Sequence, residues 1–444
     1  MEMETKEKHV FEKAINKYID LLNSQMETFP IIMNTLVARL QASTKKMKKF
    51  MDTNNIKQTE EGDNITISVP VELNKEFVKH NTAISQAISA IQLIPQNIVV
   101  AFVSIYDAYL SDLIEGIYTI CPDLLRTCER EYSFSEILRF DSIEAIKRHI
   151  IEKEVETVLR ESHTKQFEWL SKKVGVSLTE DLPNFNAFIE ITERRNLFVH
   201  TNGKVSRQYL SIVSDSTKND NLKIGDILTA SPDYVVHCYH ILFEIGVKLG
   251  QVIWRKLDEK NSLEQADCLL MDIVYDLLKS KKYDLAIILS EFSTKKYVKS
   301  FNQSHDYVKC INKALGYYLV GDSDKCKSII NNVDWSATEL KYKLAIKVLV
   351  EDFVEACAIM KEIGANDYMK EAYREWPLFT KFRDENSFKE TYKGIYQVDF
   401  DYIETKPLRW EDIIKEAIEL NKMVEKEKSV YNKVDDIEVE QVLN

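Results

Sequence analysis

Three residues suited to acid–base and anion chemistry lie close together at residues 193–207, which read ERRNLFVHTNGKVSR. Asn196 directly follows Arg195, and His200 comes after a gap of four residues from that arginine. A histidine titrates near neutral pH, whereas an arginine keeps its positive charge. Together they can transfer protons and stabilise an anionic phosphorane. The alternative is purely structural, because histidine and arginine also stabilise the C-terminal ends of helices.

These residues are expected on a helix that starts after Pro183 and stops at Asn202-Gly203. Asn and Gly readily adopt the left-handed conformation in which many helices end. His200 would then lie in the last turn, where the negative end of the helix dipole favours a protonated imidazole. The helix therefore delivers His200 to its own C-terminal end.

The spacing of this helix separates the candidate residues onto two faces. Glu193, Asn196 and His200 align with Ile189, so Glu193 is a possible orienting group for His200, although a surface partner is the simpler interpretation. Arg195 falls on a different, apolar face together with Phe188, Ile191 and Phe198. A charged side chain on such a face must be paired, or must face an interface or a cleft.

Net charge limits where a nucleic acid could bind. The chain carries a formal charge of −12, which disfavours long-range attraction of nucleic acid, so a site must be a local basic patch. One such patch surrounds the motif, where Arg194, Lys204 and Arg207 are candidates for contacts with flanking phosphates. A second basic run, KKMKKF at 45–50, is interpreted as a solvated helix face.

Composition indicates a helical protein from a reducing compartment. Only 11 Gly and 8 Pro occur in 444 residues, which favours long helices over strands joined by tight turns. The seven cysteines are scattered and never form a CxxC pair, which argues against disulfides and a zinc ribbon. The N-terminus lacks an apolar signal segment, and the apolar stretch 91–110 contains polar residues, so it is expected to be a buried helix. We therefore predict an all-α cytoplasmic protein without a membrane segment.

Motifs for a metal or a cofactor are missing. His237 and His240 flank Cys238 on an apolar helix, with no fourth ligand nearby, so core or interface histidines are expected there. No GxxxxGK, GxSxG or HExxH pattern occurs in the sequence. We predict neither a metal site nor a cofactor.

Helical periodicity organises the first half of the chain. A helix is expected over 8–50 with a break at Pro30, followed by a polar segment, 54–74, that forms either a short hairpin or an ordered loop. Helical spacing resumes from 75 to 118, interrupted near Pro95. A further apolar helix over 231–254 starts with a Ser-Pro-Asp capping signal.

The motif and its surroundings resemble the HEPN superfamily, small helical-bundle ribonucleases and RNA-binding domains. Its motif is an arginine, four to six residues and a histidine, often with Asn, Asp or His after the arginine, and RNLFVH matches it. The stretch VAFVSIYDAYLSDLIEGIY resembles the preceding core helix of that family, and 231–254 the closing helix. The resemblance covers residues 75–255.

The resemblance implies metal-independent cleavage of RNA, in which the 2′-hydroxyl attacks phosphorus and leaves a 2′,3′-cyclic phosphate. By the same resemblance, His200 is the general acid or base, Arg195 stabilises the phosphorane, and Asn196 orients the phosphate or the histidine. Members of the family typically form homodimers in which both motif helices line one cleft. That arrangement would explain why Arg195 lies on an apolar face. Microbial members are often toxins or antiviral effectors.

Three later stretches resemble one another as helical hairpins, at 271–292, 312–333 and 344–364. Each has a first helix, a polar turn and a second helix. In the second helix an aromatic residue or serine is followed three positions later by alanine or cysteine. These anchors are Tyr283 with Ala286, Ser323 with Cys326, and Phe353 with Ala356. Such hairpins bury a shared core only when they stack. The middle one, ALGYYLVGDSDKC, resembles a tetratricopeptide repeat.

The sequence thus predicts four parts: an N-terminal helical extension (1–74), a HEPN-like ribonuclease domain (75–257), a short tetratricopeptide-like α-solenoid (258–400), and a C-terminal helix with a charged tail (401–444). The repeats would bind a protein, a peptide or the ribonuclease domain itself and so regulate it. Two alternatives remain open: a non-catalytic interaction scaffold, and an accessory RNA binder that does not cut.

Overall fold

The computed structural model describes residues 8–56, 58–61, 64–128, 131–180, 182–213 and 222–401 of the chain. Within these residues the fold is helical apart from one short hairpin, in which β1 (Gln58–Glu61) pairs antiparallel with β2 (Asn64–Ile67). The prediction of an all-α fold is confirmed. The hairpin was one of the two alternatives for the polar segment between the first two helices.

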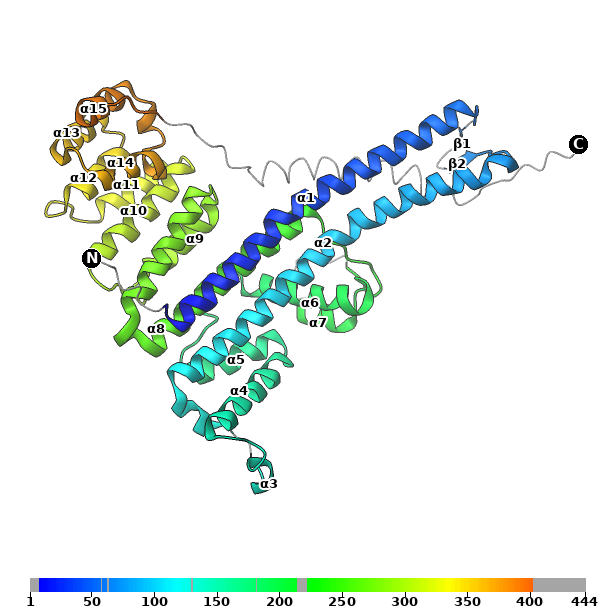
Figure 1. Ribbon diagram of the computed structural model, residues 1–444, viewed down its shortest axis with the longest axis horizontal. Helices are drawn as coiled ribbons and strands as arrows, with labels where there is room; N and C mark the ends of the chain where they lie inside the picture. The colour runs from blue at the N-terminus through cyan, green and yellow to red at the C-terminus, as the bar shows by residue number, and fades with distance from the viewer. Residues whose placement is uncertain are drawn as a thin grey trace, which may run out of the picture.

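Two long helices form an arm that extends away from the rest of the molecule (Figure 1). They are α1 (Val10–Thr53) and α2 (Val71–Ile120), joined at the far end by the β1–β2 hairpin. Both expected breaks are wrong, because Pro30 and Pro95 lie inside continuous helices. An internal proline costs about 3 kcal/mol. Both prolines are buried where the two helices pack, and the apolar contacts along the arm offset that cost.

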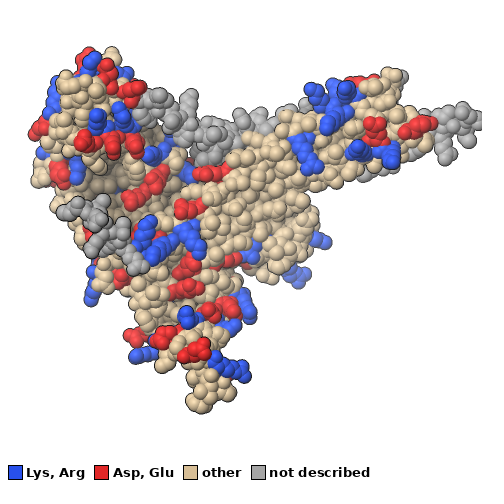
Figure 2. All heavy atoms as spheres, viewed as in Figure 1, with Lys and Arg blue, Asp and Glu red and all other residues tan. Residues whose placement is uncertain are grey.

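The lysine run at 45–50 lies on the outer part of this arm. Lys45, Lys46, Lys48 and Lys49 are exposed, whereas Met47 and Phe50 are buried against α2. Basic side chains gather there in the space-filling view (Figure 2). The run is therefore the solvated face of an amphipathic helix.

A helical bundle surrounds the base of the arm. Its long central helix is α8 (Pro232–Lys279), which begins at the expected capping signal, where Ser231 accepts a hydrogen bond from the backbone of Tyr234. The other members are η1 (Pro122–Thr127), α4 (Ile143–Leu159), α5 (His163–Val174), α6 (Phe185–Thr201) and α7 (Arg207–Val213). The short helix α3 (Phe134–Ile137) lies away from the bundle and buries none of its residues (Figure 1).

Helices α1, α2 and α8 approach each other closely at the base. Tyr18 donates a hydrogen bond to the carbonyl of Leu242 at 2.7 Å, and Tyr109 donates one to the carbonyl of Gly246 at 3.0 Å. A Cβ at Gly246 would lie 2.1 Å from the ring of Tyr18, so only glycine fits there. The N-terminal helix α1 therefore shares one apolar core with the bundle. This core includes residues from before and after the boundary expected near residue 74.

Helix α8 passes from the bundle into the repeats through a kink. Its backbone leaves helical geometry at Asp258 and Ser262, next to the expected boundary at 257/258. The kink is held by Trp254, which donates to the hydroxyl of Ser262 at 2.7 Å, and by that hydroxyl, which donates to the carbonyl of Asp258 at 2.9 Å.

The second part of α8 forms the first of several stacked helical hairpins. The following helices are α9 (Tyr283–Ser293), α10 (Gln303–Leu319), α11 (Ser323–Asn331), α12 (Leu340–Leu349) and α13 (Phe353–Ile363). The second helix of each predicted hairpin begins at Tyr283, Ser323 or Phe353, the residues expected from the sequence. The small anchors are fully buried: Ala286, Cys326 and Ala356.

The three hairpins also share one turn. A residue with positive φ ends the first helix in each of them: Lys281, Gly321 and Glu351. The next residue then donates its backbone N–H, at 2.9 Å, to the carbonyl five residues earlier, in the pairs Lys282–Leu277, Asp322–Tyr317 and Asp352–Lys347. The stretches that look alike in sequence therefore have the same local geometry.

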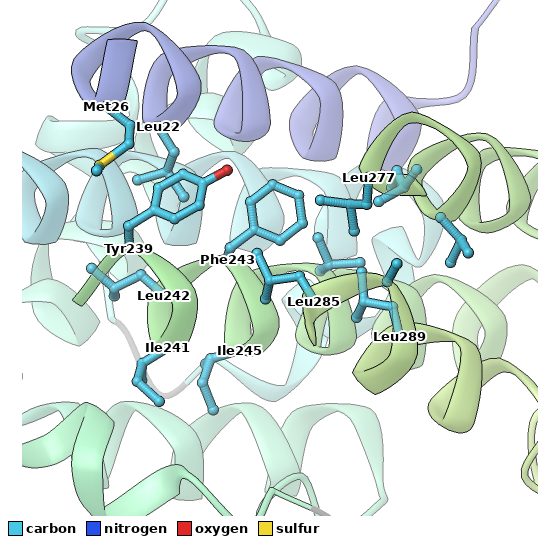
Figure 3. Packing of buried hydrophobic residues seen from close by; sticks show 14 of the residues in the cluster. Leu22, Met26, Tyr239, Ile241, Leu242, Phe243, Ile245, Leu277, Leu285 and Leu289 are labelled. Atoms are coloured by element: carbon cyan, nitrogen blue, oxygen red, sulfur yellow. The ribbon is translucent and has the colours of Figure 1, made fainter. Parts of the chain in front are cut away.

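The hairpins pack directly on the bundle. Figure 3 shows Tyr239 and Phe243 of α8 between Leu22 and Met26 of α1 on one side and Leu277 and Leu285 of the first hairpin on the other. The apolar core is continuous from the arm into the repeats.

The described chain closes with α14 (Asp367–Glu375), η2 (Pro377–Phe379), η3 (Phe382–Asp384) and α15 (Asn386–Tyr396). Aromatic side chains fill this end, where Tyr373 packs edge-on against Phe379 and Phe388. Apart from Asp401, the expected C-terminal helix and tail fall outside the described residues.

One helix in the described chain, α2, is long and apolar enough to cross a membrane by length and composition. It contains the stretch 91–110, and it packs against α1, α6 and α8. These contacts are those of a core helix, as expected for this stretch.

Candidate functional site

The motif helix α6 has the expected limits and the expected stop. It ends at Thr201, and Asn202 and Gly203 follow in the left-handed conformation, with φ of 52° and 83°. Gly203 donates its N–H to the carbonyl of Leu197 at 3.0 Å. A Cβ at Gly203 would lie 2.2 Å from the carbonyl oxygen of Leu228, so the stop is closed on one side by the 222–228 segment. The end of the motif helix is thereby fixed.

Arg195 is paired within its own chain. Its Nη2 donates to Oδ2 of Asp107 on α2 at 2.6 Å, and its side chain is only 19% exposed. Its Nε is buried and has no hydrogen-bond partner in the described chain. The apolar face that carries Arg195 therefore packs against α2, and a second copy of the chain is not needed to explain the charge.

Asp107 also contacts a buried histidine. Nε2 of His163, at the start of α5, lies 3.1 Å from Oδ1 of Asp107. The His163 ring is enclosed by Tyr106 and Phe188, with ring centroids 6.0 and 5.6 Å away. One carboxylate thus holds an arginine and an imidazole from two different helices.

Sequence reasoning missed both Asp107 and His163. The available signal was complementary: Asp107 is a lone acid in the apolar stretch 91–110, and Arg195 is a lone base on the apolar face of another helix. Buried charges are generally paired, so each of these residues required a partner of the opposite sign. The identity of that partner depends on the fold.

Glu193 lies inside the same cluster, with 7% of its surface exposed. Burial raises the pKa of its carboxyl group, while His163, a hydrogen bond with Asn196, and Arg195 act in the opposite direction. The described contacts of Glu193 are therefore with these neighbours, and none joins it to His200. The proposed orientation of His200 by Glu193 has no support in this placement.

The end of α6 presents a polar edge to solvent. His200, Lys204 and Arg207 are exposed, and Asn196 is half-buried one turn before the histidine. Lys204 forms an isolated backbone bridge with Ile227, which holds the loop beside the helix end. The candidate residues on this edge are accessible to a large ligand such as RNA.

Arg194 has a structural position instead. Its Nε donates to Glu190 at 2.7 Å, and its guanidinium lies 4.1 Å from the ring centre of Tyr234. Glu190 also accepts hydrogen bonds from Tyr209 at 2.6 Å and Tyr234 at 2.7 Å. Burial first, and then the negative charge of Glu190, raise the pKa of the Tyr209 hydroxyl. This cluster fastens α6 to α7 and α8, and we do not carry Arg194 forward as a phosphate contact.

No group of three or more His, Cys, Asp or Glu side chains suited to a metal ion occurs among the residues that the structure describes. Cys238 is fully buried, and burial lowers the pKa of the neighbouring His240. Both features are those of a core helix.

Comparison with known families, curated proteins and solved structures found no match. The resemblance to HEPN ribonucleases therefore rests on the motif and its helical surroundings. The geometry adds that Arg195 of the motif is anchored in the bundle and that His200 is open to solvent.

Proposed function

We propose that the chain is a metal-independent endoribonuclease, acting in the cytoplasm as a regulated toxin or antiviral effector. The observation that carries the proposal is the different placement of Arg195 and His200 on α6. Asp107 holds Arg195 in a fixed position, while His200 is exposed to solvent at the fixed end of the same helix. Catalysis by electrostatic stabilisation depends on such preorganised charge.

In the proposed reaction, the 2′-hydroxyl of a ribose attacks the adjacent phosphorus and loses its proton. The bond from phosphorus to the 5′-oxygen breaks, and that oxygen gains a proton, leaving a 2′,3′-cyclic phosphate and a 5′-hydroxyl. His200 acts as general acid or base. Arg195 stabilises the charge on the phosphorane through Nη1, because Nη2 donates to Asp107 and Nε is buried. Asn196 orients the phosphate or the histidine, and Lys204 and Arg207 hold flanking phosphates.

A homodimer would supply a second histidine, so that one imidazole removes a proton and the other returns one. Exposed apolar side chains flank the end of α6: Val199 is 50% exposed, Ile224 58% and Ile227 61%. Exposed apolar residues that lie close together often mark an interface. The surface beside His200 is therefore suited to a second copy of the chain.

The test is cleavage of RNA in EDTA by wild type, His200→Ala and Arg195→Lys. The lysine keeps a positive charge beside Asp107, so the bundle stays folded, but it cannot reproduce the donor geometry of a guanidinium. We expect wild type to produce 2′,3′-cyclic phosphate ends and His200→Ala to lose at least a hundredfold in rate, a typical contribution of a general acid or base.

Lys204→Ala serves as a matched control on the same edge, and it should weaken RNA binding without abolishing cleavage. Equal activity in all the proteins would indicate a contaminant and reject the assignment. RNA binding without products, with a strong dependence on salt, would support the non-cutting alternative. A strictly monomeric wild type by light scattering at micromolar concentration would reject the shared cleft.

A further inference from the structure

A groove runs across the face of the stacked hairpins that is formed by their first helices. It has a volume of about 460 Å³ and is lined by residues of α8, α10, α12 and α14. Four aromatic side chains dominate its wall: Tyr275, Tyr342, Tyr368 and Trp376. We call it the aromatic groove. Its volume lies in the range of pockets that bind ligands.

The charged side chains of the aromatic groove are mostly acidic. Asp272, Glu371 and Glu375 line it, and Lys341 is the basic residue among its described lining. Lys341 and Glu375 are each engaged, with Glu339 and Lys279 at 2.9 Å. In the described part of the chain, neither Asp272 nor Glu371 forms an ion pair. The groove therefore offers two uncompensated carboxylates.

A second observation indicates a negative electrostatic potential in the aromatic groove. The pKa of the Asp272 carboxyl is raised, first by partial burial and then by the negative charges of Asp276 and Glu12. Glu12 is on α1, so the arm adds negative charge to the groove. A positively charged ligand would relieve this repulsion.

Two further groups in the aromatic groove lack hydrogen-bond partners. Asn312 is only 4% exposed and lines the groove, and its amide makes no hydrogen bond with the described residues. Nε1 of Trp376 is a buried donor without a partner there. Buried polar groups are normally satisfied, so unpaired ones at a cavity wall indicate a ligand that brings donors and acceptors.

We propose that the aromatic groove binds a peptide segment of another protein that carries an arginine or lysine next to an apolar residue. A cation is attracted both by carboxylates and by the faces of aromatic rings. The peptide backbone supplies the acceptor for Trp376 and the partners for Asn312, and the apolar neighbour packs on the aromatic wall. Acidic peptides and RNA are repelled by the same carboxylates. This inference does not depend on the ribonuclease proposal.

The experiment starts with selection of a displayed library of random 12-residue peptides on the full chain. Enriched peptides are then synthesised with a fluorescent label, and their affinities are measured by fluorescence polarisation. We expect enriched sequences to contain Arg or Lys, and replacement of that residue by Gln to weaken binding about tenfold or more, the equivalent of about 1.4 kcal/mol.

Variants of the groove identify the binding site. Asp272→Asn combined with Glu371→Gln should weaken binding about tenfold. Tyr368→Ala should also weaken it, and because that side chain is 74% exposed the substitution leaves the core intact. Glu362→Gln, an exposed acid on α13, is the control and should have no effect.

Three outcomes overturn the proposal. They are a selection that enriches nothing, enriched peptides that are acidic or lack a basic residue, and binding that is equally strong in the doubly neutralised groove. Absence of RNA cleavage by wild type, or equal cleavage by all the variants described earlier, would leave these outcomes unchanged, so the two proposals fail separately.

Discussion

Replacement of Asp107 by asparagine removes the charge that holds Arg195 while keeping the size of the side chain. The carboxylate presents two acceptor oxygens, one to Arg195 and one to His163, at 2.6 and 3.1 Å. An amide presents one acceptor and one pair of donor hydrogens. Asp107→Asn therefore leaves one acceptor for Arg195 and removes the negative charge beside that arginine, so the free energy of unfolding of the bundle should fall.

The expected magnitude follows from the exposure of the pair. Arg195 is 19% exposed and Asp107 29%, so the pair is neither fully buried nor free in solvent. Removal of one partner from a fully buried pair costs about 3–5 kcal/mol, whereas an exposed pair contributes about 0–1 kcal/mol. We expect a loss of about 2 kcal/mol, the usual value for a hydrogen bond to a charged group. In a cooperative unit of about 150–250 residues that corresponds to a fall in Tm of about 4–8 °C, and in a larger unit to a smaller fall.

The assay is thermal and urea unfolding followed by circular dichroism, with Asp112→Asn as the matched control. Asp112 lies on the same helix and pairs with Lys17 at 2.8 Å, but Lys17 is 59% exposed. The control should lose less than about 1 kcal/mol. A double-mutant cycle with Arg195→Met then isolates the pair. If Asp107→Asn is no more destabilising than Asp112→Asn, or if the coupling energy is near zero, the anchoring role of Asp107 is refuted.

Two further changes test the helix stop and a buried lysine. Gly203→Ala should destabilise the chain by more than Gly321→Ala in urea unfolding. Both positions have positive φ, but of the two only Gly203 would bring its new Cβ against a backbone atom, the carbonyl oxygen of Leu228. Equal effects would contradict this expectation. Burial lowers the pKa of Lys282 to about 8, so its charge costs stability below that pH and the cost is relieved as the pH rises. From pH 7 to 9 the wild type should therefore gain about 1.3 kcal/mol over Lys282→Met, measured from urea midpoints, and parallel behaviour of the two proteins would contradict the buried charge.

Local features of the chain were predictable where a short stretch contains its own cause. The stop at Asn202-Gly203 and the cap at Ser231 are determined by residues within a few positions, and both were found. The hairpins were found for a related reason, since a buried small residue such as Ala286 recurs at the same place in each.

The features that the sequence did not predict depend on residues that are far apart in the chain. Pro30 and Pro95 are tolerated because each lies in a helix that packs along a partner, and local propensity does not contain that contact. Asp107 and Arg195 are 88 positions apart, and Asp107 and His163 are 56 apart. Only the arrangement of the helices brings these side chains together. The sequence could state that Arg195 needed a partner, but the fold alone identifies which one.

The shared helix α8 has a consequence for how this protein can be divided. A truncation after residue 257 would remove Leu277 and Leu285, and it would leave Tyr239 and Phe243 without the cover they have in Figure 3. The shortened bundle would then expose a continuous apolar strip along its central helix. The bundle and the repeats therefore cannot be exchanged independently of each other. A protein that acquires a different set of repeats must also change the apolar surface of its bundle. A force applied to the repeats acts directly on α8, the helix against which the motif helix α6 packs.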